Sequence, residues 1–281
     1  ELSDNFSNYR KSRAVILPIP YEKTTSYLKG TGKGPDAIIK ASAQIESYDD
    51  ELGDIFKPGI CTLNPLKIDS RPEQMVNEVK KRILELLDDN KFIAVLGGEH
   101  SITSGIVRAF KEKFRDLSVL QIDAHADLRE EYQGSRHSHA CAMKRVLELC
   151  PVVPVGIRSM SSQEAEFAKK SNYRIFWAKD IVGNDKWHNE AISTLSKNVY
   201  ITFDLDGLDP SIMPSVGTPE PGGLGYYEAL KFLREIFRKR NVVGFDIVEL
   251  CPDGHDVSSD VAAARILYKM IGYKFIEKEK L

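Results

Sequence analysis

Three ionisable side chains at alternate positions end an apolar stretch of the sequence. The segment LSVLQIDAHADLREE runs apolar from 117 to 122 and then carries Asp123, His125 and Asp127. In an extended segment residues i, i+2 and i+4 point to one face, so these three side chains are expected to converge just past a strand. Two carboxylates placed so close repel each other unless positive charge lies between them. The pattern therefore predicts a cation site.

Two other segments place ionisable residues directly after apolar runs. VLGGEHS carries Glu99 and His100, and ITFDLDGLDP carries Asp204, Asp206 and Asp209. Because ligands of open parallel sheets bind outside the carboxyl ends of the strands, we expect these groups at the same edge as the first three. Taken singly, such an Asp is more often a turn former, and such a His a hydrogen-bonded structural residue. The joint pattern favours a shared site.

Charge arithmetic favours two divalent cations at this edge. Four Asp side chains carry four negative charges, which two such ions neutralise, while two neutral imidazoles complete the set. Carboxylates and imidazoles without thiolates favour Mn, Fe, Co or Zn, and the acid-rich balance favours Mn. A bridging Asp123 or Asp204 would hold the ions about 3.5–4 Å apart, as in two-metal sites that hydrolyse substrates with a bridging hydroxide. The expected ligands are His100, Asp123, His125, Asp127, Asp204 and Asp206.

The elements that must position these groups are strands alternating with helices. One predicted helix follows Ser70 with Pro72 in its first turn, and another follows Gly225 and ends at a basic RKR stretch. This alternation predicts an α/β fold with a mostly parallel sheet covered on both faces. No repeat or linker divides residues 1–281, so we expect one domain. Apolar runs predict buried strands at 14–19, 91–97, 117–122, 151–157, 173–178, 199–203 and 242–250.

Composition excludes several classes of partner. The 39 Lys and Arg residues against 41 Asp and Glu residues give a net charge of −2, without a basic stripe for nucleic acid or a polybasic membrane anchor. No apolar run approaches the roughly 20 residues of a membrane-spanning helix. The four cysteines form no CxxC pair, so we expect reduced thiols in a cytoplasmic protein. A small-molecule partner is favoured.

Six ordered motifs resemble those of the ureohydrolase family, which contains arginases and agmatinases. They are TTSYLKGTGKGPDAIIKAS, GGEHS, DAHADLR, GIRSM, TFDLDGLDP with GTPEPGGL, and VGFDIVEL, and the likeness spans about residues 14–270. Several ordered motifs are far more specific than any single one. The resemblance implies a three-layer α/β/α sandwich with a dimanganese centre at the strand ends. It also implies a homo-oligomer, either a trimer or a hexamer.

The resemblance divides the ligands between two ions. One ion would be held by His100, Asp127 and the two bridging residues Asp123 and Asp204, and the other by His125, Asp206 and the same two bridges. Asp209 is expected to support the site or to cap the GLDP turn.

Three further residues gain roles from the resemblance. Glu249 matches the family's guanidinium-binding glutamate, since a carboxylate accepts two parallel hydrogen bonds from that planar cation. His139 matches the histidine that carries a proton to the departing amine and contacts the substrate. Thr218, in GTPEPGGL, is expected to line the substrate site.

Several positions carry other expectations. His137 is a candidate for the wall of the substrate pocket, and His188 in its polar stretch is expected to be an exposed surface residue. His255 stands where many agmatinases have an aromatic residue, so the pocket wall there is expected to differ, while Asp256 is retained. Glu99 replaces the Asp of many relatives and is expected to lie behind the metal ligands.

Substrate choice rests on the residues around the presumed entrance. LREEYQGSRHSHACAM lacks the Asn with which arginases bind the α-carboxylate, and Glu130, Glu131 and Glu220 suggest an acidic entrance suited to a dication. We therefore expect agmatine to be hydrolysed to urea and putrescine, a step of polyamine biosynthesis. N1-aminopropylagmatine, guanidinobutyrate and arginine are the rival substrates. A metal-binding regulatory subunit without activity is the alternative from another class.

Asp123→Asn or Asp204→Asn is expected to remove both divalent ions or nearly so, because each carboxylate would bridge them. Elemental analysis of the purified, manganese-reconstituted variants measures this. Full occupancy of two ions in both variants would remove the bridging assignment.

Overall fold

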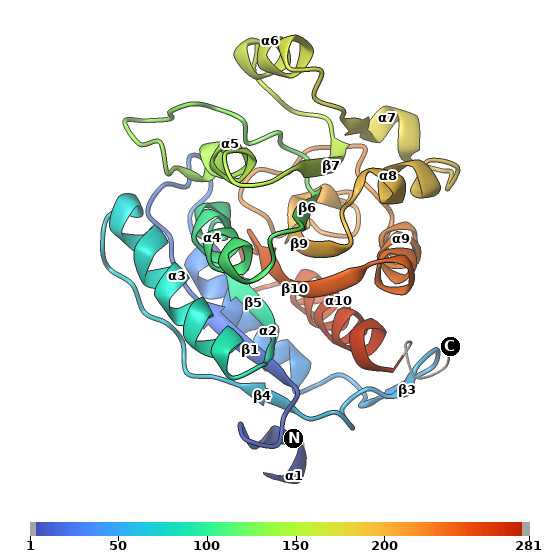
Figure 1. Ribbon diagram of the computed structural model, residues 1–281. Helices are drawn as coiled ribbons and strands as arrows, with labels where there is room; N and C mark the ends of the chain where they lie inside the picture. The colour runs from blue at the N-terminus through green and yellow to red at the C-terminus, as the bar shows by residue number, and fades with distance from the viewer. Residues whose placement is uncertain (1–3, 277–281) are drawn as a thin grey trace.

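The computed structural model describes residues 4–276. Its centre is a sheet of eight parallel strands in the order β4-β1-β5-β10-β9-β6-β7-β8 (Figure 1). A small antiparallel hairpin, β2–β3, lies apart from it. The strands are β1 (Ala14–Ile19), β2 (Tyr48–Asp49), β3 (Gly53–Asp54), β4 (Ile60–Thr62), β5 (Phe92–Gly97), β6 (Leu117–Ile122), β7 (Val152–Ile157), β8 (Phe176–Trp177), β9 (Asn198–Asp204) and β10 (Asn241–Val248).

Helices cover both faces of the sheet and enclose two apolar cores. Helices α3, α4 and α5 pack on one face, and α2, α8, α9 and α10 on the other. Tyr200 belongs to the first core and its neighbour Ile201 to the second, as the alternation of side chains along a strand requires. The helices are α1 (Asp4–Ser7), α2 (Gly34–Ser42), α3 (Pro72–Asp88), α4 (Thr103–Lys113), α5 (Ala142–Leu147), α6 (Ser162–Lys170), α7 (Ala178–Ile181), α8 (His188–Thr194), α9 (Tyr226–Lys239) and α10 (Ser258–Phe275).

The expected α/β/α layering is confirmed, with differences at the ends and edges of the sheet. The predicted strands 14–19 and 117–122 have those bounds, and the two predicted helices are α3 and α9. The run 173–178 forms only the two-residue edge strand β8, and the short edge strand β4 was missed. Strand β10 ends before position 250 because Glu249 has φ +67°, which takes the backbone out of the extended region.

Single helical turns follow three of the strands or loops that carry predicted site residues. These turns are η2 (His100–Ile102), η3 (His139–Cys141) and η4 (Leu205–Gly207), while η1 (Thr31–Lys33) precedes α2. A tight turn directly after a strand brings its side chains back over the strand end. The carboxyl edge of the sheet therefore contains several tight turns.

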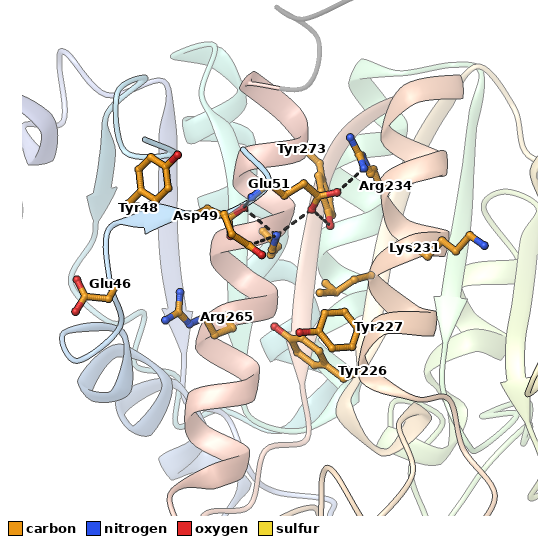
Figure 2. A pocket seen from close by; sticks show the side chains of 13 residues that line it. Glu46, Tyr48, Asp49, Glu51, Tyr226, Tyr227, Lys231, Arg234, Arg265 and Tyr273 are labelled. Carbon is orange, nitrogen blue, oxygen red and sulfur yellow. Dashed lines mark hydrogen bonds and ion pairs between the residues drawn. The ribbon is translucent and has the colours of Figure 1, made fainter. Parts of the chain in front are cut away.

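A hollow lies away from this edge, between the β2–β3 hairpin, α9 and α10 (Figure 2). Its volume is about 720 Å³. Lys269 on α10 binds Asp49 at 2.8 Å and Glu51 at 2.9 Å, and its side chain is only 11% exposed. Because a buried ammonium is costly unless paired, these contacts fix the hairpin to α10. None of the predicted site residues lines this hollow.

Two expectations from composition can be compared with the structure. All four cysteines are buried and free. Between residues 4 and 276, no helix combines the length and the apolar character that crossing a membrane requires.

Gly98 permits the end of β5 to approach the segment that follows β1 closely. Its N–H donates to Ile19 O, and the next N–H, of Glu99, donates to Tyr21 O, both at 2.9 Å. A Cβ at position 98 would lie 2.1 Å from the Tyr21 carbonyl oxygen. Only glycine fits here without displacing the backbone that precedes His100.

Gly98→Ala is expected to lower the free energy of unfolding by about 1–3 kcal/mol, the usual cost of overpacking. Urea denaturation measures it. Gly217→Ala is the control, since its added methyl would meet its nearest neighbours at 3.8 Å. Equal stability of the two variants would contradict the steric argument.

Candidate metal centre and substrate cavity

A cavity of about 230 Å³ opens at the carboxyl ends of the central strands. It is smaller than the hollow beside α10, but it contains most of the residues that the sequence singles out. Other side chains of its wall include Ser26, Arg129, Tyr132 and Met160. The predicted site residues that line it are His125, Asp127, His139, Asp204, Asp206, Thr218 and Glu249.

A first cluster surrounds the ring of His100. Its Nδ1 lies 3.0 Å from an oxygen of Asp127, 3.3 Å from one of Asp123 and 3.4 Å from one of Asp204. This nitrogen is buried and hydrogen-bonds to none of them. One nitrogen and three carboxylate oxygens thus converge without saturating one another, as the ligands of a cation do.

Hydrogen bonds behind His100 set which nitrogen carries its proton in the neutral ring. Thr202 Oγ1 donates its one proton to Asp246 Oδ1 at 2.6 Å. It can therefore only accept from His100 Nε2, which lies 2.9 Å away. Asp246 is held in turn by Tyr200 and Thr103, each at 2.9 Å. The neutral tautomer with Nδ1 unprotonated faces the carboxylates, and such second partners are typical of metal-binding histidines.

A second cluster joins His125, Asp206 and Asp123. His125 Nδ1 lies 2.9 Å from an oxygen of Asp206 and 3.9 Å from one of Asp123. Gln121 donates to Asp123 Oδ2 at 2.9 Å and to the His125 carbonyl at 3.0 Å, which fixes the carboxylate between the two clusters. Asp123 belongs to both groups of residues that could hold an ion, whereas Asp204 belongs to the one around His100.

In the absence of ions, the close packing of these acids shifts the pKa values of several side chains in the site. Burial and the neighbouring Asp206 raise the pKa of Asp123 to about 7. Burial, with Asp206 and Asp123, raises the pKa of Asp204 well above its ordinary value. Burial opposes protonation of His125, but Asp206 raises its pKa to about 10. The site therefore holds protons where positive charge is needed.

These residues fit a pair of divalent ions. The donors are buried carboxylate oxygens and imidazole nitrogens without thiolate, a set suited to Mn, Fe, Co or Zn. Asp123 and His100 are fully buried, and Asp127, Asp204 and Asp206 are 7%, 3% and 2% exposed. Four acids at this depth require compensating charge, which two divalent ions supply.

The convergence of Asp123, His125 and Asp127 is confirmed, but the extended segment proposed for it is wrong. Strand β6 ends at Ile122, and Asp127 has φ +53°. Its side chain consequently turns toward His100, while His125 points to Asp206. A left-handed Asp is uncommon and marks a site that the surroundings hold in place.

Glu249 lies beside the first cluster and has the partner that its burial requires. Its Oε1 accepts the His100 backbone N–H at 2.6 Å. Burial raises the pKa of Glu249 well above its ordinary value, although that hydrogen bond opposes the rise. The carboxyl group lines the cavity and can face a cationic substrate.

His139 faces Glu249 across the cavity, with Nδ1 3.9 Å from Oε1. Its Nε2 is buried without a hydrogen-bond partner, and burial lowers the pKa of the ring. Its backbone N–H donates to Thr24 Oγ1 at 2.9 Å, and Thr24 donates to Glu99 Oε1 at 2.6 Å. Glu99 is fully buried and holds the N-terminal loop that reaches His139.

Comparison with known proteins agrees with this geometry. A family model described as Arginase family matches residues 12–272. A protein of Synechocystis named N(1)-aminopropylagmatine ureohydrolase is 44% identical over 281 residues, covering 96% of this chain and 92% of its own. The chain belongs to the arginase family. It is therefore an enzyme of the ureohydrolase type, and the alternative of an inactive regulatory subunit is not favoured.

Two other arginase-family proteins extend the comparison. An agmatinase of Pyrococcus horikoshii is 35% identical, covering 92% of this chain and 90% of its own. A crystal structure described as the agmatine ureohydrolase of Thermoplasma volcanium superposes with a TM-score of 0.91 at 32% identity, covering 100% of this chain and 96% of that one. The arginase-like fold predicted from the sequence is thereby confirmed.

Two histidines do not lie where the sequence of this arginase-family chain predicted, and a third, whose role was left open, lies outside the cavity. His188 is 3% exposed and not a surface residue, because Glu235 of α9 lies 3.0 Å from its Nδ1. His137 does not line the cavity, although His139 does. His255 is exposed and also lies outside the cavity wall.

The acidic entrance is only partly present. Glu130 is bound by Arg136 and by Arg145, which lies 3.0 Å away, and neither it nor Glu131 lines the cavity. Glu220 does approach the site, 3.9 Å from His125 Nε2. Thr218 donates to Asp206 at 3.4 Å.

Other expectations agree with the contacts, and two residues were missed. Asp209 accepts the backbone N–H groups of Ser211, Gly222 and Gly223, and so caps the turn. Gln121 and Tyr132 were not identified from the sequence. The sequence signal for Gln121, which is fully buried, was a polar residue inside an apolar run. Nothing in the sequence pattern marked Tyr132 as part of the cavity.

Binding of a divalent ion is expected to release protons, and its affinity to rise with pH between 6 and 8. Asp123, with a pKa of about 7, and His125, with a pKa of about 10, hold protons in the ion-free chain that the ion must displace. Isothermal titration with Mn²⁺ in Pipes and in Tris, which differ in ionisation enthalpy, counts these protons. Identical heats in both buffers and an affinity independent of pH would contradict this assignment.

Proposed function

We propose that the chain is an N1-aminopropylagmatine ureohydrolase, which releases urea and leaves spermidine. The observation that carries this proposal is the 44% identity to the Synechocystis ureohydrolase of that name over nearly the whole chain. A second such relative, from Thermus thermophilus, is 40% identical over 96% of the chain. Agmatine, the substrate first expected from the sequence, becomes the second candidate.

Agmatine is retained as a candidate because of two relatives. The Pyrococcus agmatinase is 35% identical to this chain, and the Thermoplasma agmatine ureohydrolase shares the fold at 32% identity. The argument from an acidic entrance is weaker than before, since Arg136 and Arg145 neutralise Glu130. Both substrates present the same guanidinium and differ in the length and charge of the tail.

The proposed metal ligands follow the two clusters. His100 and Asp127 would hold one ion, and His125 and Asp206 the other, with Asp123 shared between them and Asp204 as a second bridge. The distances around His100 Nδ1 and His125 Nδ1 support this division. The acid-rich donor set favours Mn²⁺. When bound, such a pair supplies Lewis acidity and a hydroxide nucleophile at neutral pH.

Glu249 would orient the guanidinium. A carboxylate accepts two parallel N–H bonds from this planar cation, and the fixed His100 N–H bond at 2.6 Å holds the carboxylate in place. The cation in turn favours the ionised form of Glu249, whose burial otherwise raises its pKa. Binding energy from this pair would hold the guanidinium carbon over the metal centre.

His139 would carry the proton that the departing amine requires. Burial lowers its pKa, so the ring is neutral near pH 7 and can accept a proton before it donates one. The unpartnered Nε2 is the free proton-accepting position. Thr24, through the His139 backbone, would keep the ring beside Glu249. Thr218 would line the path of the substrate.

Two wider properties stay predictions. Four buried free thiols support a reducing, cytoplasmic location. The trimer or hexamer expected from the family rests on the resemblance alone.

The proposed substrate is tested by kcat/KM values of the manganese-reconstituted enzyme for aminopropylagmatine, agmatine, guanidinobutyrate and arginine, with urea detected. We expect aminopropylagmatine to exceed agmatine by about tenfold or more, which corresponds to ~1.4 kcal/mol. Arginine should be poor, since the segment 128–143 has no Asn for its carboxylate. Glu249→Gln, matched in size, is the control for contaminating activity.

The outcomes separate the candidates. A preference for agmatine would select the second candidate without changing the chemistry. Arginine as the best substrate, or no urea from any of the four compounds, would overturn both.

A further inference from the structure

The guanidinium of Arg158 is bound almost entirely by backbone carbonyl oxygens. It follows β7 in the GIRSM segment and lies partly buried near the second cluster. Its shortest contacts are 2.6 Å to Asp206 O and 2.8 Å to Glu220 O. Bonds of 3.0 Å reach Pro221 O and Gly156 O, and longer ones reach Leu208 O at 3.2 Å and Gly207 O at 3.5 Å.

These carbonyls belong to three separate pieces of chain. One piece is the η4 turn, which carries Asp206, and another is the loop 217–224, which carries Thr218 and Glu220. The third is the end of β7 itself. A rigid fork of five N–H donors can join such pieces, whereas a single ammonium cannot reach all of them.

The backbone of the same residue reaches the other ligand segment of the second cluster. The Arg158 N–H donates to Ala124 O at 2.8 Å, directly between Asp123 and His125. Ser159 forms a parallel bridge with His125. One residue therefore contacts, through its side chain and its backbone, both segments that bring His125 and Asp206 to 2.9 Å.

We propose that Arg158 is the positioning residue of the second ion, the one assigned to His125 and Asp206, and acts by fixing the η4 turn against the 123–125 segment. This rests on the two-ion centre proposed above. Arg158 touches neither the substrate-binding Glu249 nor His139 in any described hydrogen bond. Its effect on turnover is exerted through the ion that it helps to hold.

The two ligands that belong to the first ion alone, His100 and Asp127, do not depend on the Arg158 side chain. The ring of His100 is oriented by Thr202 and Asp246. Asp127 is held by its carbonyl, which accepts the Lys144 N–H at 3.0 Å. Among the described residues no hydrogen bond joins Arg158 to either segment. Loss of the Arg158 side chain should therefore weaken binding of the second ion and leave the first ion bound. A general loss of structure would instead weaken binding of both ions.

Charge and geometry make different demands on the replacement. If only the positive charge near Asp206 mattered, Arg158→Lys would preserve the second ion. Because the role proposed here needs the fork that joins three pieces of chain, Arg158→Lys and Arg158→Met should behave alike. Arg240 offers a matched control, since its guanidinium also binds carbonyl oxygens, those of Ile192, Leu195 and Lys239, but away from the site.

The experiment is a Mn²⁺ titration of the ion-free full chain, followed by calorimetry and by electron paramagnetic resonance. The wild type and Arg240→Lys should bind two ions and give the spectrum of a coupled pair. Both Arg158 variants should bind the first ion with little change, weaken the second by about 10–100-fold, and show the spectrum of an isolated Mn²⁺ at one equivalent. Circular dichroism checks the fold.

The outcomes are distinct. Two ions bound with unchanged affinity in both Arg158 variants would overturn the proposal, and so would loss of both ions or of folding in Arg158→Lys. If Arg158→Lys bound the second ion as the wild type does and Arg158→Met did not, the positive charge alone would be sufficient. That result would also overturn the proposal. Fewer than two ions in the wild type would instead refute the proposed metal centre.

Discussion

The mutual repulsion of buried carboxylates is the constraint on which the functional edge of this enzyme depends. Asp123, Asp204 and Asp206 lie almost without solvent at the ends of two adjacent strands, and the cost of ionising them together appears as the raised pKa of Asp123 and Asp204. A sheet tolerates such a cluster only if protons or cations compensate it, because the apolar layers on both faces offer no water. The chemistry and the requirement for ions thus have the same physical origin.

The chain answers this constraint with buried polar groups that hold the ligands in place. Thr202 and Asp246 fix the proton of His100, Gln121 holds Asp123, and Glu99 gathers the loop that reaches His139. Each of these partners is buried inside or behind the sheet. Because these hydrogen bonds tie the ligands to buried residues and do not involve an ion, they can hold the acids close together before any ion is present. Rigidity comes from the sheet, and orientation from these partners.

Much of this could be predicted from the sequence, and the exceptions have physical reasons. Apolar runs located the central strands because strands buried on both faces leave an uninterrupted pattern, and acids directly after such runs gave Asp123, Asp204 and Asp206. The burial of His188 escaped prediction since it depends on Glu235, which a helix 47 positions away supplies. Arg158 and Thr24 act on backbone atoms, which every residue shares, so no spacing of residue types reveals them. The left-handed turn at Asp127 follows from packing around it.

The order of the strands has a consequence for how the enzyme comes into being. His100 follows β5 and Asp123 follows β6, which are consecutive long strands in the chain, yet β10 and β9 lie between them in the sheet. A nascent chain that has passed Asp127, just beyond β6, therefore possesses four of the six histidine and aspartate donors but no surface on which they can meet. Only when the last strand has inserted does the edge close, since parallel pairing over such separations comes late. Ion capture must then be one of the final events of maturation, and a truncated chain ending before β10 could not acquire the centre at all.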